Sequence, residues 1–594
     1  MIEKKALKFW FEKSNLINWK KKPKKIIKIK KNKFQWFPDG TLNVAENCIG
    51  NNIKKGMGNK NAIIYLKENG EEQCISYKQL NILVKNFSYF ISKNLRIKNS
   101  HVMIHGSASL ETAVSMLACA NIGLNHCVIF EELEKEAILK RMNIVKPKLF
   151  ISKTSNKKLI NFLKKQKKKN DYKLLFFGKN GNIALKDFTK INYYKKKNLK
   201  YFKSNNKLFT LFTSGSTGEP KGIIHSSAGY LIYAKYTCIK QFGINKNSTF
   251  LCASDAGWIN GHTYSLYGPL SIGATTVILE KPTMILNTNK LKKYLLKYKV
   301  TILYLPVTLI RMMKAYNINL KIKSAALKTL GSMGEPLAKN VASWFAKAFN
   351  LKKKSIVNTY FQTETGGIIC SPRYNQKSNT FGTVGKPINK NIKLNLKKYS
   401  SKKNNIENYL KIKNIWPGCM IDVCNGDKIW KKYWDNENNF NLFDVASLDK
   451  NNNILIHGRN DDVINIRGHR VGSGEIESTI LEIVEISEVC AVPIEDLIEG
   501  NRLCIFCVSK KSNYKIKEKI NIKLNNSFGS FAIPKEIFFV NAIPKTRSGK
   551  IMRRILRIML NKSKENLGDM STILDKKPII DIQKKINKYS LRLF

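Results

Sequence analysis

A loop rich in serine, threonine and glycine is the segment of this sequence best suited to chemistry. It reads Phe212-Thr-Ser-Gly-Ser-Thr-Gly-Glu-Pro-Lys-Gly222 and directly follows an apolar strand predicted over residues 207–212. Glycine lets a backbone approach an anion closely, hydroxyl groups add donors, and Lys221 supplies positive charge. The pattern predicts a triphosphate cradle, although the Gly-Lys-Ser/Thr of a Walker loop is absent and a flexible turn is the alternative. The cradle residues are Thr213, Ser214, Gly215, Ser216, Thr217, Gly218 and Lys221.

Other polar, glycine-containing segments stand before and after this loop in a definite order. Each one alone is compatible with a strand followed by a turn, so only the set and its spacing are informative. Those after the loop read Ala253-Ser-Asp-Ala-Gly-Trp-Ile-Asn-Gly-His-Thr-Tyr264, Leu330-Gly-Ser-Met-Gly-Glu-Pro336, Asn358-Thr-Tyr-Phe-Gln-Thr-Glu-Thr-Gly-Gly367, Gly458-Arg-Asn-Asp-Asp462, Arg467-Gly-His-Arg470 and Pro544-Lys-Thr-Arg-Ser-Gly-Lys550. Near the N-terminus the chain reads Phe37-Pro-Asp-Gly-Thr-Leu-Asn-Val-Ala-Glu-Asn-Cys48.

On these segments the chain resembles the acetyl-CoA synthetase branch of the adenylate-forming acyl-CoA ligase (ANL) superfamily over nearly its whole length. The resemblance implies an AMP-forming ligase that uses ATP and coenzyme A to turn a short carboxylic acid into its thioester through an acyl-adenylate. Magnesium is expected to arrive with ATP. Acetate is the first expected substrate, and propionate or another short acid, hydroxylated or not, is the alternative. An enzyme that passes the acyl group to a carrier is a second alternative.

The same resemblance assigns the nucleotide site. It implies an adenine and α-phosphate site, a magnesium-associated carboxylate at Glu364, a ribose-binding pair of Asp444 and Arg459, and a phosphate contact at Arg470. A carboxylate suits the ribose because it accepts from both hydroxyl groups, while a guanidinium donates in a fixed geometry. A turn aspartate and a surface salt bridge are the alternatives for Asp444 and Arg470. The adenine and α-phosphate residues are Gly334, Glu335, Pro336, Asn358, Thr359, Tyr360, Phe361, Gln362 and Thr363.

Lys550 is the catalytic residue that the resemblance implies. Attack of a carboxylate on the α-phosphorus builds negative charge on oxygen, and an ammonium group stabilises that transition state more than the ground state. In such a lysine-rich chain only the surrounding motif distinguishes Lys550 from a solvated surface residue. Asp461 matches the family's hinge, and Arg467, Gly468 and Asn260 are expected to border the coenzyme A channel.

The acyl pocket is expected at Ile259, Asn260, Met333 and Phe361, and here the chain departs from the family. Acetate-selective members usually carry two tryptophans where Tyr360 and Phe361 stand. Phenylalanine is smaller than an indole, so the pocket can admit an extra carbon, and one methylene is worth only about 1–3 kcal/mol of discrimination. The exact acid therefore stays open.

Alternating apolar strands and helical stretches predict an α/β fold. Short strands are expected at 102–105 and 148–152 with a helix at 110–123 between them, and this alternation continues to about residue 390. Residues 455–560 have an apolar pattern of their own. The expected organisation is a large multi-layer N-terminal domain (1–458), a hinge (459–461), a small mobile α+β domain with Lys550 (462–560) and a basic tail (561–594).

The net charge of +63 makes a nucleic-acid-binding protein the alternative from another class. Only 13 of the 105 basic residues are arginines, and the lysines are spread along the chain, whereas a base-reading protein favours arginine and clusters its charge. We therefore expect small-molecule partners, no nucleic acid and no membrane. No run approaches the roughly 20 apolar residues of a spanning helix, and a cytoplasmic enzyme with reduced thiols is expected. The sequence leaves monomer or homodimer open.

Overall fold

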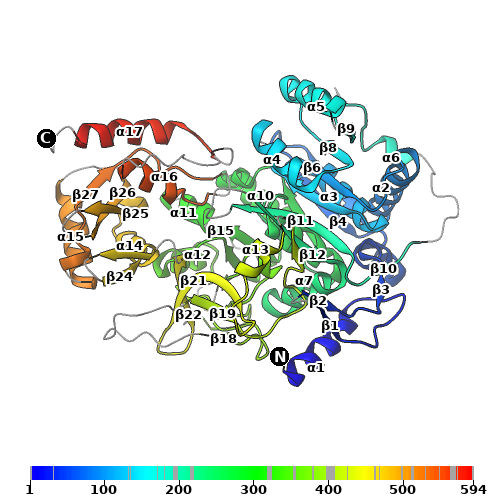
Figure 1. The fold of residues 1–594 in the computed structure, drawn as a ribbon, viewed down its shortest axis with the longest axis horizontal. Coiled ribbons are helices and arrows are strands. Elements are labelled where there is room, and N and C mark those ends of the chain that lie inside the picture. Colours follow the sequence, from blue (N-terminus) through cyan, green and yellow to red (C-terminus); the bar gives the residue numbers. More distant parts are fainter. Residues whose placement is uncertain are drawn as a thin grey trace.

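The chain folds into a large N-terminal unit and a smaller C-terminal unit that lie side by side (Figure 1). The computed structural model describes the chain except residues 1–2, 31–32, 132, 134, 170, 179–180, 191–198, 215–219, 317–323, 352–355, 378–379, 396–408, 425, 460–462, 467–468, 497–499, 510–513, 529, 547–548, 562–569, 571–572 and 591–594. This arrangement confirms the expected α/β class with a large N-terminal and a small C-terminal domain. The boundaries at 458 and 560 stay predictions, and the hinge residue Asp461 lies outside the described residues.

Two seven-stranded sheets build the large unit. The first has the order β20-β12-β11-β7-β6-β8-β9, and the second has the order β17-β16-β15-β13-β14-β4-β5. The strands of the first sheet are β6 (His101–His105), β7 (Asn125–Ile129), β8 (Leu149–Ser152), β9 (Lys173–Phe176), β11 (Lys207–Ser214), β12 (Pro220–Ser226) and β20 (Asp422–Val423). Those of the second are β4 (Asn61–Leu66), β5 (Glu72–Ser76), β13 (Thr249–Cys252), β14 (Thr275–Leu279), β15 (Ile302–Pro306), β16 (Thr329–Met333) and β17 (Val357–Asn358).

Most neighbouring strands in these sheets are parallel, as expected from the continuous apolar runs that form them. In the second sheet every pairing except β4 with β5 is parallel. Strand β14 reads Thr-Thr-Val-Ile-Leu and is buried at every position, which is the pattern of a strand covered on both faces. The helices of this unit are α1 (Lys4–Lys13), α2 (Tyr77–Tyr89), α3 (Leu110–Ile122), α4 (Lys135–Val145), α5 (Lys157–Lys169), α6 (Asp187–Lys190), α7 (Ser227–Phe242), α8 (Ile259–His262), α9 (Gly268–Ile272), α10 (Thr288–Lys297), α11 (Val307–Ala315), α12 (Lys339–Ala348) and α13 (Asp427–Lys432).

The two ends of helix α3 are set by residues at its termini. Ser109 caps its first turn by accepting a hydrogen bond from the backbone N–H of Thr112, and the helix ends at Gly123, whose φ is +74°. A methyl group at Gly123 would lie 2.4 Å from the Phe202 ring, so glycine is required there for space as well as for backbone angle. Almost every residue of α3 is buried, because the helix lies between its sheet and neighbouring helix α2.

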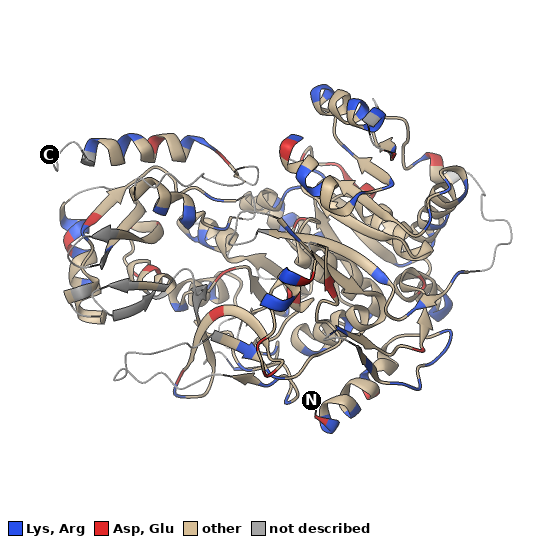
Figure 2. Cartoon of the chain, in the orientation of Figure 1, with Lys and Arg blue, Asp and Glu red and all other residues tan. Residues whose placement is uncertain are grey.

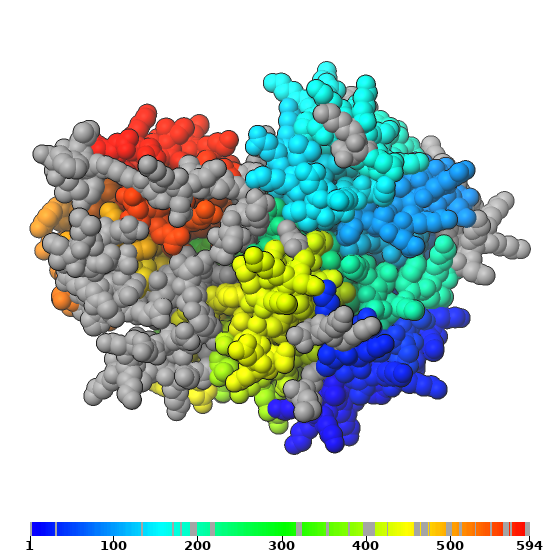
Figure 3. Space-filling model, in the orientation of Figure 1, coloured from blue at the N-terminus to red at the C-terminus, as the bar shows by residue number. Residues whose placement is uncertain are grey.

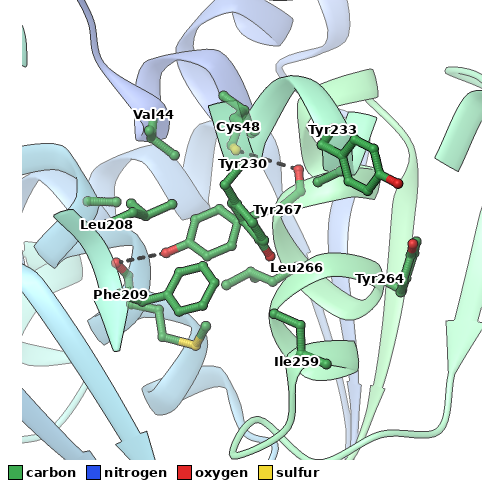
Figure 4. Packing of buried hydrophobic residues seen from close by; sticks show 14 of the residues in the cluster. Val44, Cys48, Leu208, Phe209, Tyr230, Tyr233, Ile259, Tyr264, Leu266 and Tyr267 are labelled. Carbon is green, nitrogen blue, oxygen red and sulfur yellow. Dashed lines mark hydrogen bonds between the residues drawn. The ribbon is translucent and has the colours of Figure 1, made fainter. Parts of the chain in front are cut away.

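The largest apolar cluster lies between the two seven-stranded sheets. It contains Val102 and Leu211 from the first sheet and Phe250 and Ile302 from the second. Aromatic rings fill much of it, and Figure 4 shows Tyr230 of α7 against Phe209 of β11, with centroids 4.7 Å apart and planes at 80°. Such edge-to-face contacts add to the stabilisation from buried area.

Smaller sheets complete the large unit. A four-stranded sheet has the order β18-β19-β21-β22. The N-terminal hairpin β1–β2 lies against β20 and α13: Lys33 forms an ion pair with Asp422 of β20 at 2.9 Å, and the ring of Phe34 packs on Trp430 of α13. Figure 3 shows this N-terminal segment in dark blue beside the yellow surface. The strands are β1 (Ile27–Lys30), β2 (Lys33–Trp36), β3 (Thr41–Leu42), β10 (Phe202–Lys203), β18 (Leu394–Asn395), β19 (Tyr409–Ile412), β21 (Phe440–Leu448) and β22 (Ile454–Arg459).

A three-stranded sheet, β25-β26-β27, forms the centre of the small unit. Cys504 and Cys507, three residues apart on β26, lie in different apolar clusters, because side chains at an odd spacing on a strand point to opposite faces of the sheet. The elements of this unit are β23 (Val463–Ile466), β24 (His469–Gly472), α14 (Ser473–Ile480), β25 (Ile486–Asp496), β26 (Gly500–Ser509), α15 (Tyr514–Phe528), β27 (Glu536–Phe539), α16 (Arg553–Leu560) and α17 (Lys577–Ser590).

The C-terminal segment is part of this small unit. Ile582 and Ile586 of α17 are buried in the same apolar cluster as Leu556 of α16. Just before α17 the chain pairs with the segment that precedes Lys550: Ile573 bridges Thr546, and the backbone N–H of Leu574 donates to the Lys545 carbonyl at 2.8 Å. The lysine-rich tail therefore contributes core side chains and one strand contact.

Lysine and arginine are spread over both units instead of gathering on one face (Figure 2). Among the helices that the structure describes, none is both long enough and apolar enough to cross a membrane.

Buried imidazoles predict that the fold loses stability in mild acid. Burial lowers the pKa of His101, His105 and His225 to about 4 and that of His262 to about 3. An exposed histidine has a pKa of about 6.5, so between pH 6.5 and 4 the unfolded chain binds more protons than the folded one. Stability should be full above pH 6.5 and fall as the pH drops toward 4, by roughly 1 kcal/mol per histidine at pH 5.5. The measurement is the urea unfolding midpoint from pH 7.5 to 5; an unchanged midpoint contradicts it.

Candidate active site

Four segments begin where neighbouring strands of the second sheet end. Three of them contain expected site residues, and the fourth, 307–311, lies between two of these in the strand order. Residues 253–260 follow β13, 307–311 follow β15, 334–336 follow β16 and 359–364 follow β17. These strands are adjacent and parallel, so their carboxyl ends lie at one edge of the second sheet. Ligands of open α/β sheets bind outside this edge. The sheet therefore brings together residues that are about 100 positions apart in the sequence.

Asn358 and Thr359 are buried and hydrogen-bonded to the protein. Asn358 donates from Nδ2 to the Thr383 carbonyl at 2.8 Å, and its Oδ1 accepts from Ser332 at 3.0 Å. Thr359 Oγ1 donates to the Ser332 carbonyl at 2.8 Å and lies 2.6 Å from the Tyr304 hydroxyl. Both side chains thus anchor the segment that continues into residues 360–364.

The carboxylate of Asp444 is held by two of the other expected site residues. It is 7% exposed, and its Oδ2 accepts from the Tyr360 hydroxyl at 2.5 Å and from Gln362 Nε2 at 2.6 Å. On the neighbouring strand Arg459 is paired with Asp444 in the backbone register, although its side chain is not described. The fold thus places the backbones of the two expected ribose-binding residues opposite each other on neighbouring strands.

Glu364 lies on the short turn η7 (Thr363–Thr365) and is 8% exposed. Its Oε1 accepts from the Tyr433 hydroxyl at 2.7 Å, and the carbonyl of the preceding Thr363 is 2.7 Å from His225 Nε2. A carboxylate has about four lone-pair sites, so this hydrogen bond leaves oxygen capacity for a cation. An oxygen ligand of this kind fits magnesium, which prefers a few carboxylates together with phosphates and water.

The loop after β11 is framed by a hairpin. Thr213 pairs with Lys221 and Ser214 pairs with Pro220 across β11 and β12. Lys221 Nζ lies 5.8 Å from the centroid of the Tyr433 ring. The expected cradle residues Gly215, Ser216, Thr217 and Gly218 lie outside the described residues, as does the side chain of Ser214.

Gly334 turns the chain at the end of β16 with φ +91°, a conformation that glycine adopts without strain. The next residue, Glu335, forms an ion pair with Arg311 of α11. This contact was not expected from the sequence, which assigned Glu335 to the adenine site. Pro336 completes the expected segment and precedes α12.

The expected acyl-pocket residues surround a group of aromatic rings. The ring of Phe361 meets that of Tyr264 edge to face at 5.5 Å, and Ile259 and Met333 are buried in the same apolar cluster. Ile259 and Tyr264 are both visible in Figure 4. Asn260 is half-buried, and its Oδ1 has no hydrogen-bond partner among the described residues. The surroundings suit a short apolar acyl chain.

Lys550 lies at the end of a tight turn and is exposed. The backbone N–H of Thr546 donates to the Lys550 carbonyl at 2.8 Å, and that of Gly549 donates to the Thr546 carbonyl at 2.8 Å. Gly549 has φ +83°, and a methyl group at this position would lie 2.5 Å from Oγ1 of Thr308 on α11. The turn therefore contacts the large unit just beyond the end of β15, at the edge described above.

Charged residues accompany this contact. Arg311 of the large unit, already paired with Glu335, interacts electrostatically with Glu477 and Glu488 of the small unit. Burial lowers the pKa of the Arg311 guanidinium, whereas the two glutamates oppose that shift. In the small unit Glu488 pairs with Lys545, five residues before the candidate catalytic lysine.

Sequence reasoning missed Arg311, Thr308 and Tyr433. The signal for Arg311 was its rarity, because only 13 of the 105 basic residues in this chain are arginines. Tyr433 stands in a lysine- and tryptophan-containing stretch with no motif of its own.

The remaining expected residues follow Arg459 in the sequence. Asp461, Arg467 and Gly468 lie outside the described residues, and Arg470 is on β24 with its side chain not described.

Family models match three parts of the chain. The model described as AMP-binding enzyme matches residues 51–402, which is more than half of the chain. The chain belongs to the AMP-binding enzymes. Residues 475–550 match the C-terminal domain of these enzymes, and residues 2–48 match the N-terminus of acetyl-coenzyme A synthetase.

Similar AMP-binding enzymes span almost the whole chain. Acetyl-coenzyme A synthetase of Leptospira biflexa is 33% identical over 97% of this chain and 94% of its own length, and that of Vibrio vulnificus is 32% identical over 96% and 92%. Among solved structures, acetoacetyl-CoA synthetase from Streptomyces lividans has a TM-score of 0.82 at 16% identity, covering 98% of this chain and 92% of its own. An anthranilate CoA ligase with anthranoyl-AMP has a TM-score of 0.73 at 16% identity, covering 87% and 96%. The protein is an adenylate-forming acyl-CoA ligase, with ATP and coenzyme A as its family's substrates.

The charged contact predicts that Arg311→Met impairs adenylate formation more than nucleotide binding. Without the guanidinium, Glu335 loses its partner and the small unit loses an electrostatic attraction to the large one. We expect carboxylate-dependent exchange of pyrophosphate into ATP to fall about tenfold. The dissociation constant of ATP, measured by calorimetry, should change less than twofold.

Arg96→Met, which removes an exposed arginine of the large unit, serves as the control. Equal losses of ATP affinity and exchange rate in Arg311→Met, or no loss of exchange, would show that this contact does not help to place the lysine turn.

Proposed function

We propose that this AMP-binding enzyme is an acetate–CoA ligase. It forms acetyl-adenylate and pyrophosphate from acetate and ATP, and then acetyl-CoA and AMP from the adenylate and coenzyme A. The names of its relatives and the match of residues 2–48 support acetate. We further propose that the enzyme works in the cytoplasm, where its twelve thiols stay reduced.

The contact of the Lys550 turn with α11 is the observation on which the catalytic proposal rests. Gly549 meets Thr308 at the carboxyl edge of the second sheet, which is also the edge from which residues 334–336 and 359–364 project. An exposed ammonium on this turn can reach a nucleotide bound at that edge. The position of Lys550 in the fold thus supports the catalytic role that its motif implies.

In the first half-reaction a carboxylate oxygen attacks the α-phosphorus, and the bond from this phosphorus to the pyrophosphate oxygen breaks. Lys550 then faces the negative charge that grows on the nonbridging oxygens. Asp444, fixed by Tyr360 and Gln362, is placed to accept from the ribose hydroxyls without reorganising. Magnesium, which we propose to be held by Glu364 together with the ATP phosphates, would neutralise part of the phosphate charge.

In the second half-reaction the coenzyme A sulfur attacks the acyl carbonyl carbon, the bond to AMP breaks, and the thiol proton passes to solvent. The thiol needs the space that the lysine turn occupies. We therefore propose that the small domain turns about residues 459–461 and that Arg467, Gly468 and Asn260 border the coenzyme A channel. The apolar clusters that the small unit forms from its own residues support its movement as one body.

The size of Phe361 makes propionate a second candidate substrate. Phe361 is partly buried at the edge of Tyr264, and its ring is smaller than the indole of acetate-selective relatives. A hydroxylated short acid is a further candidate because Asn260 Oδ1 has no protein partner among the described residues.

Lys550→Ala should lose carboxylate-dependent pyrophosphate release by at least about 100-fold, because the ammonium acts mainly in the transition state. ATP binding, measured by calorimetry, should stay within about threefold of the wild-type value. The assay runs on acetate, propionate, butyrate and 3-hydroxypropionate, with and without coenzyme A. Full activity of the variant would remove the proposed role of Lys550, and turnover without coenzyme A would favour another acyl acceptor.

Phe361→Trp should shift the enzyme toward acetate. A larger ring shortens the pocket, so the ratio of kcat/KM for propionate to that for acetate should drop about tenfold, within the range expected for one methylene. Because Phe361 also belongs to the expected nucleotide segment, the readout is the ratio for the two acids, which share the same ATP affinity. An unchanged ratio would place the pocket floor elsewhere.

A further inference from the structure

Tyr433 is a buried aromatic residue at the end of α13 that the expected site did not include. It is 3% exposed, and its hydroxyl donates to Oε1 of Glu364 at 2.7 Å. Glu364 is the carboxylate that we propose for magnesium. A hydrogen bond from a neutral donor to a charged carboxylate, shielded from water, is among the stronger protein hydrogen bonds.

The face of the same ring meets the lysine of the phosphate loop. Lys221 Nζ lies 5.8 Å from the centroid of the Tyr433 ring, within the range of a cation–π interaction. Lys221 stands on β12, opposite Thr213 across the hairpin that frames the loop. One residue therefore contacts both the candidate metal carboxylate and the candidate phosphate cation.

Tyr433 is itself held in place from several sides. Its ring stacks on Phe440 at 5.8 Å with planes 13° apart, and it meets Phe443 edge to face at 5.6 Å. Its carbonyl accepts from the backbone N–H of Asn441 at 2.8 Å. Phe443 precedes Asp444 in the chain, so the same packing reaches the proposed ribose carboxylate.

The N-terminal hairpin adds support for this helix end. Lys33 pairs with Asp422 at 2.9 Å and with Asp427 at 3.3 Å, and Asp427 is the first residue of α13. The ring of Phe34 packs on Trp430 and Trp434, which flank the tyrosine in the chain. Tyr433 is thus a rigid group placed between two flexible side chains.

We propose that Tyr433 is a positioning residue for the magnesium-bound triphosphate. Its hydroxyl sets the orientation of Glu364, and its ring sets the place of Lys221. The inference rests on the proposed ATP-dependent function and extends it to a residue outside the recognised motifs. Glutamate and lysine side chains lose much rotamer freedom when they engage a ligand, and a partner that orders them beforehand removes part of that cost.

Calorimetric titration of ATP into the full-length protein tests this role, once with MgCl₂ and once with EDTA. Tyr433→Phe removes only the hydroxyl, so we expect ATP affinity to fall about tenfold with MgCl₂ and less than twofold with EDTA. Tyr433→Leu also removes the ring, so affinity should fall under both conditions. In pyrophosphate exchange, the magnesium concentration at half-maximal rate should rise several-fold in Tyr433→Phe, with the KM of the acid unchanged.

Tyr77→Phe is the matched control. It removes a hydroxyl that is also buried and donates to the Ala274 carbonyl at 2.7 Å, away from the candidate site. This variant should leave ATP affinity unchanged under both conditions. It also shows how much thermal stability is lost when any buried tyrosine hydroxyl is removed. Thermal midpoints of both phenylalanine variants are compared directly.

Equal losses of ATP affinity in MgCl₂ and in EDTA for Tyr433→Phe would overturn the inference. A lower thermal midpoint with unchanged ATP affinity would do the same, because it would leave only a structural role. Failure of the proposed function is a separate result: wild-type protein would then bind ATP but give no acid-dependent pyrophosphate exchange. The calorimetric comparison remains decisive in that case.

Discussion

Four segments of the candidate site depend on one constraint, the shared direction of β13, β15, β16 and β17. Parallel strands place all their carboxyl ends at the same edge of the sheet. The register of each strand with its neighbours fixes where the segment after it begins. A slip of one residue in any strand would turn its last side chain to the opposite face. The close packing of the core between the two sheets is therefore also what aligns the nucleotide and acyl residues.

The sequence was sufficient to predict the α/β class and several of its elements. Strands β6, β8 and β11 and helix α3 form where the apolar pattern indicated them, within a residue or two. The hydrogen bonds of Asp444 with Tyr360 and Gln362 could not be predicted from the sequence. They join positions about 80 residues apart, and no local sequence pattern determines the strand register that brings these positions together. The same holds for Tyr433 and Arg311, whose partners are brought near by tertiary packing alone.

Charge is used differently inside the molecule and on its surface. The lysine excess is dispersed over both units and agrees with a general compositional bias. Near the candidate site, two charged side chains that the structure describes have defined partners: Glu364 accepts from a tyrosine, and Arg311 pairs with a glutamate beside acidic groups of the small unit. Burying such groups without partners would be costly, so their pairing limits the relative positions that the two units can adopt.

The strand contact between residues 573–574 and the base of the lysine turn has a consequence for biosynthesis. The ribosome makes the chain from its N-terminus, and domains generally begin to fold in that order. The large unit, with its nucleotide edge, can form while the partner of Lys545 and Thr546 has not yet been translated. The lysine turn gains this contact only after residues 573–574 have emerged from the ribosome, later than the nucleotide edge.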